Sequence, residues 1–143
     1  MKRLLLISCS GAKNKSTGTL PAIERYSGGV YQGIKKARRE GSWPDETDIV
    51  ILSAKYGLIF ENTPVELYDQ KTNQVRAKEL QQKVSEALDA ILKESRYDQI
   101  FINMGKVYMQ SITLSLELQQ AYQQGIVQEA FGGIGTKLSQ TKK

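Results

Sequence analysis

A chain of 143 residues, 40% of them hydrophobic and 24% charged, suits one soluble globular domain with one core. It contains one cysteine and no histidine, which excludes an internal disulfide, a Ser-His-Asp or Cys-His catalytic arrangement, and a histidine-based zinc site. The net charge is +5, and residues 1–45 hold nine basic side chains against three acidic ones. Such a balance favours anionic partners.

Four short apolar segments mark the strands of the predicted fold. The runs at 4–7, 48–52 and 99–103 do not alternate with polar residues, which is typical of parallel strands covered on both faces. A shorter pair, Ile126 and Val127, fits a fourth strand. The run at 4–7 is too short for a signal peptide or a membrane helix, so we expect a cytoplasmic protein without a membrane partner.

Helical patterns fill the intervals between these strands. Apolar residues recur at helical spacing after Gly29 and again over about 72–96, where Thr72 or Asn73 is placed to cap the helix. A third helix is predicted from residue 105 or 106 towards Leu116, and a last short helix follows the glycines near the C-terminus.

This alternation of strands and helices predicts the fold class. We expect an α/β fold, namely a three-layer, Rossmann-like domain with a mostly parallel sheet of about four strands. The domain is expected to span residues 1–138, with a frayed tail at 139–143.

Polar segments follow the three main strands at the points where those strands end. They read SCSGAK, SAKYG and NMGKVY, and all three are rich in small residues and lysine. In parallel sheets, ligands bind outside the carboxyl ends of the strands, where small residues admit an anion to backbone N–H groups and lysine adds charge. None of these segments matches a P-loop, and each alone also fits an ordinary turn.

Together the segments predict a phosphate-binding pocket at the C-terminal edge of the sheet. Its candidate ligand-binding residues are Ser8, Ser10, Gly11, Lys13, Ser53, Lys55, Tyr56, Gly57, Asn103, Gly105, Lys106 and Tyr108. The late segment FGGIGTKL does not match G-x-G-x-x-G. Its Gly133 and Gly135 fit either a backbone cradle that closes the pocket or a glycine-rich cap of the last helix.

Two carboxylates and one thiol are the candidates for chemistry. Glu66 and Asp69 lie in one loop, and such a pair acts as acid, base or stabiliser of an oxocarbenium ion. The alternative for Asp69 is that it only begins the next helix. Cys9 fits a packing residue better than a nucleophile, because the chain has no histidine to activate it. We expect neither a metal nor a cofactor.

Five segments also carry a resemblance to a known family. They read SCSGAK, YSGGVYQGIKKA, ILSAKYGLIFENTPVELYD, FINMGKVYMQSI and GGIGTKL. In order and spacing they resemble a family of small bacterial and archaeal domains tied to the YaaA-like superfamily, named for a peroxide-stress protein. The resemblance implies a compact α/β fold with its motifs at one sheet edge. It also implies a connection to nucleic acid, but no defined reaction.

Two functions remain open on the sequence. The first is an enzyme that acts on a nucleotide or a nucleic-acid base, with cleavage or transfer at an N-glycosidic bond as the candidate reaction. In it Lys13 holds phosphate, Tyr56 or Tyr108 stacks on the base, and Asp69 with Glu66 supplies the chemistry. The alternative is a non-catalytic protein of stress response or defence, which binds a nucleotide or nucleic acid through its basic N-terminal third. The oligomeric state stays open.

Overall fold

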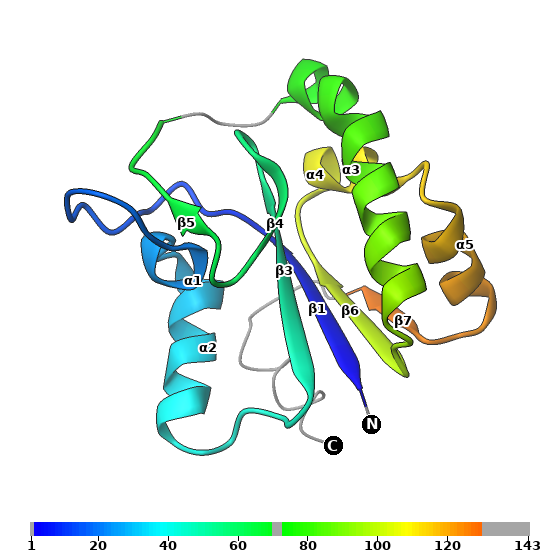
Figure 1. The fold of residues 1–143 in the computed structure, drawn as a ribbon, viewed down its shortest axis with the longest axis horizontal. Helices are drawn as coiled ribbons and strands as arrows, with labels where there is room; N and C mark the ends of the chain where they lie inside the picture. Colours follow the sequence, from blue (N-terminus) through cyan, green and yellow to red (C-terminus); the bar gives the residue numbers. More distant parts are fainter. Residues whose placement is uncertain (1, 70–72, 130–143) are drawn as a thin grey trace.

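A five-stranded, mostly parallel sheet forms the centre of the computed structural model, which describes residues 2–69 and 73–129 (Figure 1). The strand order is β4-β3-β1-β6-β7, and only β4 runs antiparallel to its neighbour β3. The strands are β1 (Arg3–Ser8), β3 (Thr47–Ser53), β4 (Gly57–Phe60), β6 (Gln99–Asn103) and β7 (Val127–Glu129). The mixed α/β class and the three main strands are confirmed, and the fourth predicted strand is β7.

The sheet has one strand more than we predicted, because the chain reverses directly after β3. Ser53 pairs with Gly57 across this reversal, and Gly57 has a φ of 81°. That left-handed conformation costs glycine little, since it has no Cβ to clash. The segment SAKYG is therefore the tight connection of a β-hairpin, and β4 follows it at the edge of the sheet.

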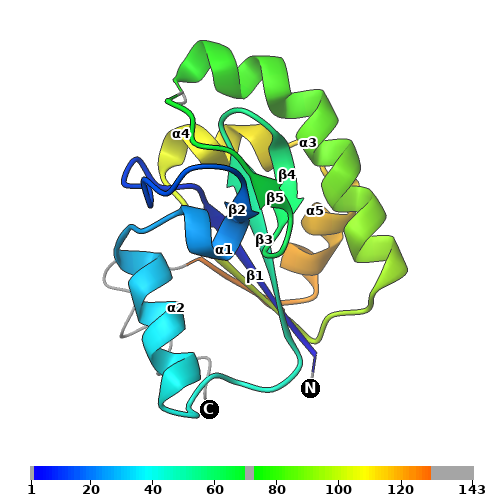
Figure 2. The same ribbon diagram turned by 60° about the vertical axis from the view of Figure 1, so that its left-hand side comes forward.

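Both faces of the sheet are covered by helices (Figures 1 and 2). Leu5 and Ile7 of β1 pack in a core cluster with residues of α1 (Ala22–Arg25) and α2 (Gly29–Arg39). Leu4 and Leu6 pack in a second cluster with residues of α3 (Gln74–Glu94) and α5 (Leu116–Gln123). Successive side chains of a strand point to opposite faces. An uninterrupted apolar run is thus what a strand between two helical layers requires.

The long helix α3 follows the prediction closely. Asn73 caps it, because its Oδ1 accepts a hydrogen bond of 2.9 Å from the N–H of Arg76. Leu80, Val84 and Leu88 form the buried stripe that the helical spacing predicts. Thr72, the other predicted cap, lies outside the described residues.

The single helix predicted from residue 105 or 106 towards Leu116 is wrong. The chain instead forms the short helix α4 (Lys106–Met109), a 3₁₀ turn η1 (Gln110–Ile112) and then α5. The break occurs at Ser115, whose side chain has one partner nearby in the sequence and one far from it. Its Oγ accepts from the N–H of Leu118 at 3.1 Å and donates to the Asp89 carboxylate at 2.6 Å, so it begins a new helix.

A small ladder outside the main sheet was not predicted. The strands β2 (Leu20–Pro21) and β5 (Pro64–Val65) pair antiparallel, and α1 follows β2 directly. The N–H groups of Ala22 and Ile23 donate to the carbonyls of Thr63 and Glu61, both at 2.9 Å. These bonds bring the segment after β1 next to the segment that carries Glu66.

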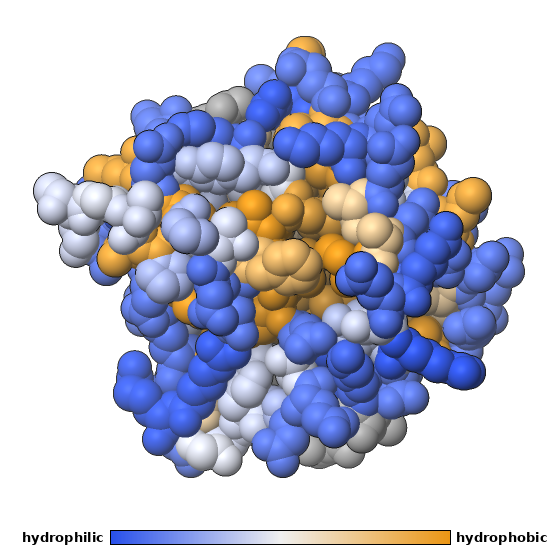
Figure 3. All heavy atoms as spheres, viewed as in Figure 1, coloured by the Kyte–Doolittle hydropathy of each residue, from blue (hydrophilic) through white to orange (hydrophobic). Residues whose placement is uncertain are grey.

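The surface around the edge strand β4 is apolar. Figure 3 shows hydrophobic side chains in the middle of this view, with hydrophilic side chains around them. Phe60 of β4 is 55% exposed, and with Ile49 and Ile91 it lines a shallow hollow beside the strand. Within the described residues, no helix is both long and apolar enough to cross a membrane. The last predicted helix, Gly133, Gly135 and the tail at 139–143 lie outside those residues.

Candidate functional site

The path of the chain selects the edge of the sheet at which a ligand is expected. After β1 the chain crosses to the face of α1 and α2, whereas after β6 it turns to the opposite face with α4 and α5. Open α/β sheets bind ligands at the carboxyl ends of neighbouring strands whose connections diverge in this way. β1 and β6 are neighbours, and Ile7 lies opposite Asn103 at their ends.

Residues from both of these strand ends meet. The Sγ of Cys9, directly after β1, lies 3.3 Å from the phenol oxygen of Tyr108 in α4. Tyr31 of α2 donates a hydrogen bond of 2.8 Å to the carbonyl of Ser8. The side-chain amide nitrogen of Asn103 is buried and has no hydrogen-bond partner among the described residues. A buried donor of this kind is normally satisfied by a water molecule or a ligand.

Three hydroxyl groups form a buried network at the end of β3. The Oγ of Ser53 accepts from the N–H groups of Lys55 and Tyr56, at 3.2 and 3.1 Å. It lies 3.0 Å from the phenol oxygen of Tyr68 and accepts from Tyr26 at 3.4 Å. The two phenol oxygens lie 2.6 Å apart. Ser53 therefore shapes the β3–β4 connection and also holds the hydroxyl of Tyr68 by a hydrogen bond.

Burial keeps the phenols of this region protonated. It is the largest cause of the raised pKa of Tyr26, Tyr31, Tyr68 and Tyr108, whose ordinary value is 10.0. The four side chains thus act as neutral hydrogen-bonding groups at physiological pH. The hydroxyl of Tyr68 points to Ser53 and Tyr26 inside the protein, which leaves its ring as the part available to other groups.

Two lysines from different loops lie over the ring of Tyr68. The ammonium group of Lys13, after β1, is 4.6 Å from the ring centroid, and that of Lys55, after β3, is 5.6 Å from it. Tyr56 meets the same ring edge-on, with 5.7 Å between centroids. An aromatic face attracts cations through its quadrupole. Tyr68 is therefore the platform on which two separate strand-end segments converge.

Among the residues that the structure describes, Lys55 has an acidic partner and Lys13 has none. Lys55 donates to Glu66 at 2.6 Å, and the phenol of Tyr56 donates to the same oxygen at 3.3 Å. Hydrogen bonding to Lys55 lowers the pKa of Glu66, and the same bond raises the pKa of Lys55. Glu66 is thus an ionised carboxylate. Lys13 donates only to the carbonyl of Gly11, at 3.4 Å, and within the described part of the chain no carboxylate pairs with it.

The remaining predicted site residues differ in their hydrogen bonds and in their exposure. Ser10 donates to the carbonyl of Ala12 at 2.6 Å and accepts from the N–H of Gly28 at 3.2 Å, which ties the first loop to the start of α2. Gly11 and Asp69 are exposed. Gly105 caps the start of α4 and, like Lys106, is exposed.

Positive charge is concentrated at this edge of the molecule. The loops after β1 and β3, the helix α4 and the first half of α3 carry these basic side chains: Lys13, Lys15, Lys55, Arg76, Lys78, Lys83 and Lys106. The same segments and the loop before α3 carry fewer acidic ones: Glu66, Asp69 and Glu79. An edge with this imbalance attracts anions over a distance of about 10 Å at moderate salt.

The basic run in α2 is different, because acidic side chains neutralise most of it. Lys35 pairs with Glu24 at 3.5 Å, and Lys36 pairs with Glu40 at 4.0 Å. Arg38 donates to Glu61 at 2.7 Å and lies over the ring of Trp43. These pairs favour the interpretation of this run as an ordinary solvated helix face.

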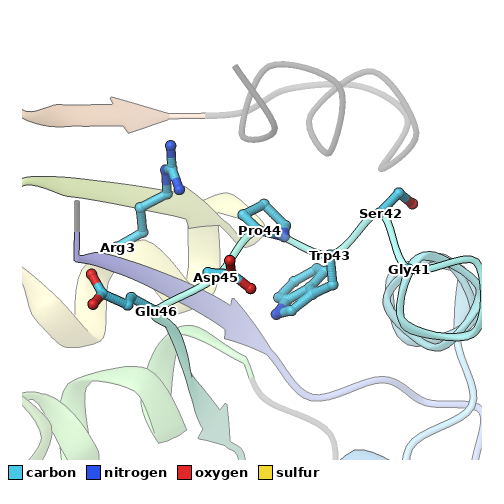
Figure 4. Close-up of a pocket in the computed structure, with 7 residues that line it drawn as sticks. All are labelled: Arg3, Gly41, Ser42, Trp43, Pro44, Asp45 and Glu46. Carbon is cyan, nitrogen blue, oxygen red and sulfur yellow. The ribbon is translucent and has the colours of Figure 1, made fainter.

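One hollow lies at the start of α3, beside the predicted edge, whereas others lie away from it. The first is lined by Gln74, Lys78, Gln81, Gln110 and Thr113. Another, of about 730 Å³, is formed at the opposite end of the sheet by Arg3 and the α2–β3 connection (Figure 4). Figure 4 shows Trp43 and Pro44 between the end of α2 and the start of the strands. The position of this hollow gives no support to the predicted phosphate pocket. That pocket depends on the basic side chains and strand-end segments that meet at the other end of the sheet. Among the described residues, no cluster of three or more His, Cys, Asp or Glu side chains is arranged for a metal.

Sequence reasoning missed one residue that organises the site. Arg25 is completely buried, and within the described residues its guanidinium donates only to backbone carbonyls, including those of Asn14 and Val65. The available signal was its spacing from Ala22, because residues three apart share a helix face and Ala22 belongs to the apolar face of α1.

These features define a small mixed α/β protein with a basic, tyrosine-lined edge at the carboxyl ends of its strands. Residues 4–143 match the family model described as a family of unknown function (DUF6884), and the chain belongs to that family. No curated protein and no solved structure matches the sequence. The description of this family names no reaction.

Proposed function

We propose that this protein is an enzyme acting on a nucleotide or another phosphate-bearing small molecule at the C-terminal edge of its sheet. The observation that carries the proposal is the position of Lys13 and Lys55. Two ammonium groups from loops 42 residues apart lie within 6 Å of the centre of one tyrosine ring, and one of them has no carboxylate partner among residues 2–69 and 73–129. Two cations held this close favour an anion between or beside them.

The wider fold supports this position for a ligand. Helices on both faces of a mostly parallel sheet fit a three-layer, Rossmann-like arrangement, which we propose for this chain together with the kinship to YaaA-like proteins. In that arrangement the ends of β1 and β6 are where a ligand binds. The buried amide nitrogen of Asn103 lies at the end of β6, and since it has no partner within the described part of the chain, it is placed to donate to a ligand there.

The proposed reaction is cleavage or transfer at an N-glycosidic bond. Lys13 and backbone amides of its loop hold the phosphate, Lys55 adds charge, and Tyr56 or Tyr108 stacks on the base. As the bond to the base lengthens, positive charge develops on the sugar. The ionised carboxylate of Glu66 suits stabilisation of that charge, and Asp69 suits activation of the attacking group, which in hydrolysis is water.

Binding of simple anions tests the proposed site. We expect inorganic phosphate and AMP to raise the melting temperature of the protein, because both bind only the folded state. Lys13→Gln removes a charge-assisted contact of about 1.4 kcal/mol, so binding of AMP weakens about tenfold in calorimetry. Lys93→Gln, an exposed lysine near the far end of α3, is the matched control and leaves binding unchanged. Equal affinities in the two variants contradict the proposal.

Turnover separates the enzyme from the non-catalytic alternative. Asp69→Asn keeps the shape of the side chain but removes its negative charge, so we expect loss of turnover with AMP affinity retained. Retained turnover removes Asp69 from the mechanism. If no nucleoside or nucleotide is cleaved by the wild-type protein while AMP still binds, the chain is a binding protein instead. Joint substitution of Lys35, Lys36, Arg38 and Arg39 by Gln then shows whether the basic helix contributes.

A further inference from the structure

Two arginines hold the backbone of the loops that carry Lys13 and Lys55. Arg25 is fully buried in α1, and Arg76 lies in the first turn of α3 with a quarter of its side chain exposed. Within the described residues, neither guanidinium depends on a buried carboxylate, since Arg25 donates to backbone carbonyls alone and Arg76 adds only Glu79, 3.5 Å away at the surface.

The contacts of Arg25 join the segment that follows Lys13 to the segment that precedes Tyr68. Its Nη1 donates to the carbonyls of Asn14 and Ser16, at 2.6 and 3.0 Å, and its Nη2 donates to that of Gly18 at 2.5 Å. Its Nε donates to the carbonyl of Val65 at 3.1 Å. Asn14 directly follows Lys13, and Val65 lies three residues before Tyr68. The planar guanidinium of Arg25 thus holds the loop of Lys13 next to the segment that carries the Tyr68 ring.

The contacts of Arg76 do the same for the second lysine. Its Nε donates to the carbonyl of Ala54 at 2.8 Å, and its Nη2 donates to the carbonyl of Lys55 at 3.0 Å. These carbonyls belong to the tight β3–β4 connection, whose N–H groups are held by Ser53. The backbone of Lys55 is therefore fixed on both its donor and its acceptor side.

We propose that Arg25 and Arg76 are positioning residues of the anion site, each acting through the lysine whose loop it holds. The inference rests on the proposed function for its binding measurements, but not for its structural readout. Arginine suits this role because its guanidinium offers five N–H donors in a fixed plane, whereas lysine offers three on a flexible stem. Neither arginine is expected to touch the ligand, since Arg25 is fully buried with its donors on backbone carbonyls, and Arg76 directs Nε and Nη2 to the backbone and Nη1 to Glu79.

A ligand-free measurement tests the structural half of the inference. Because the Lys13 ammonium lies 4.6 Å from the centroid of the Tyr68 ring, we expect the ring current to displace the neighbouring methylene resonances in the wild-type spectrum, and Lys13→Gln identifies them. We expect Arg25→Lys to move them to the position of an unstructured lysine, while Arg76→Lys and the distant control Arg38→Lys leave them in place. Unmoved resonances in a folded Arg25→Lys protein overturn the assignment of Arg25.

Double-mutant cycles with AMP test the functional half. Arg25→Lys and Lys13→Gln should each weaken binding about tenfold, and the double variant should weaken it about tenfold as well, because both remove one contact. Arg76→Lys should behave in the same way with Lys55→Gln. The crossed pairs, Arg25→Lys with Lys55→Gln and Arg76→Lys with Lys13→Gln, should multiply to about a hundredfold.

The outcomes separate positioning from general support of the fold. If an arginine merely stabilises the fold, its substitution by lysine lowers the melting temperature and couples equally to Lys13→Gln and to Lys55→Gln. Equal coupling in all four pairs therefore overturns the proposal. If wild-type protein binds neither AMP nor phosphate, the proposed function fails, and the Lys13 resonance alone decides the role of Arg25. If Arg25→Lys does not fold, Arg76→Lys carries the test, because its side chain is partly exposed and α3 has its own cap at Asn73.

Discussion

Ser53→Ala is the most direct test of how the strand-end segments are organised. Ser53 is fully buried, and its oxygen is the acceptor for the N–H groups of Lys55 and Tyr56. Alanine fits the same space but leaves two backbone donors and the phenols of Tyr26 and Tyr68 with one partner fewer. Each unsatisfied buried donor costs about 1–3 kcal/mol. Both donors are only partly buried, so each belongs in the lower half of this range. We therefore expect a total loss of about 3 kcal/mol in the free energy of unfolding.

The chain contains a matched control for this substitution. Ser85 of α3 is also buried, but it makes one hydrogen bond, a donation of 3.0 Å to the carbonyl of Ser111. Ser85→Ala should therefore cost about 1 kcal/mol. Urea unfolding followed by circular dichroism measures both values, and the melting temperatures should fall by about 6–12 °C and 2–4 °C. Equal losses in the two variants would refute the view that Ser53 is the hub of the hairpin.

Two further predictions concern charge and pH. Glu66→Gln should strengthen binding of inorganic phosphate about threefold in calorimetry, since it frees Lys55 from a bond of 2.6 Å. Weaker binding would show that Glu66 contributes to holding the anion. In alkali, the raised pKa of Tyr26, Tyr31, Tyr68 and Tyr108 means that the folded state keeps protons which the unfolded chain releases near its ordinary value of 10.0. Stability is thus constant below about pH 9 and lost as pH rises beyond 10, so phenolate absorbance should appear together with unfolding. Titration of all seven tyrosines in a protein whose circular dichroism stays native would contradict this.

The main strands and the long helix could be predicted because local sequence and burial agree there. Leu4 to Ile7 is apolar throughout since each residue faces one of two helical layers. Asn73 was recognisable as a cap because the hydrogen bond it makes is to its own helix. Both features depend on short stretches of chain, and such stretches carry their own signal.

The edge strand β4 and the break before α5 could not be predicted from such short stretches of chain. Residues 57–60 are too few to show alternation, and their pairing with β3 depends on a turn that Gly57 makes possible. The break depends on Asp89, which accepts from Ser115 across 26 residues. A periodic pattern contains no information about a partner so distant in sequence.

The candidate site, like the fold, could be predicted only in part. Its lysines, glycines and serines could be proposed because they follow strands, and parallel strands end at one edge. The identity of Tyr68 as their common platform could not, since its place depends on the β2–β5 ladder and on Arg25. The sequence also gave no means of telling that Lys55 has an acidic partner while Lys13 has none within the described residues.

The use of carbonyls in place of carboxylates around Arg25 has an electrostatic consequence for the site. A buried cation is usually balanced by a carboxylate, which satisfies its donors and cancels its charge. Here four backbone carbonyls accept from Arg25, and among the described residues no carboxylate cancels its charge next to the Lys13 loop. Arg76 adds a second charge, which in the same part of the chain only the surface carboxylate of Glu79 offsets. A carboxylate partner for either guanidinium would cancel its charge and weaken the field that draws an anion to this edge. The same two residues therefore provide both the geometry and part of the positive potential of this edge.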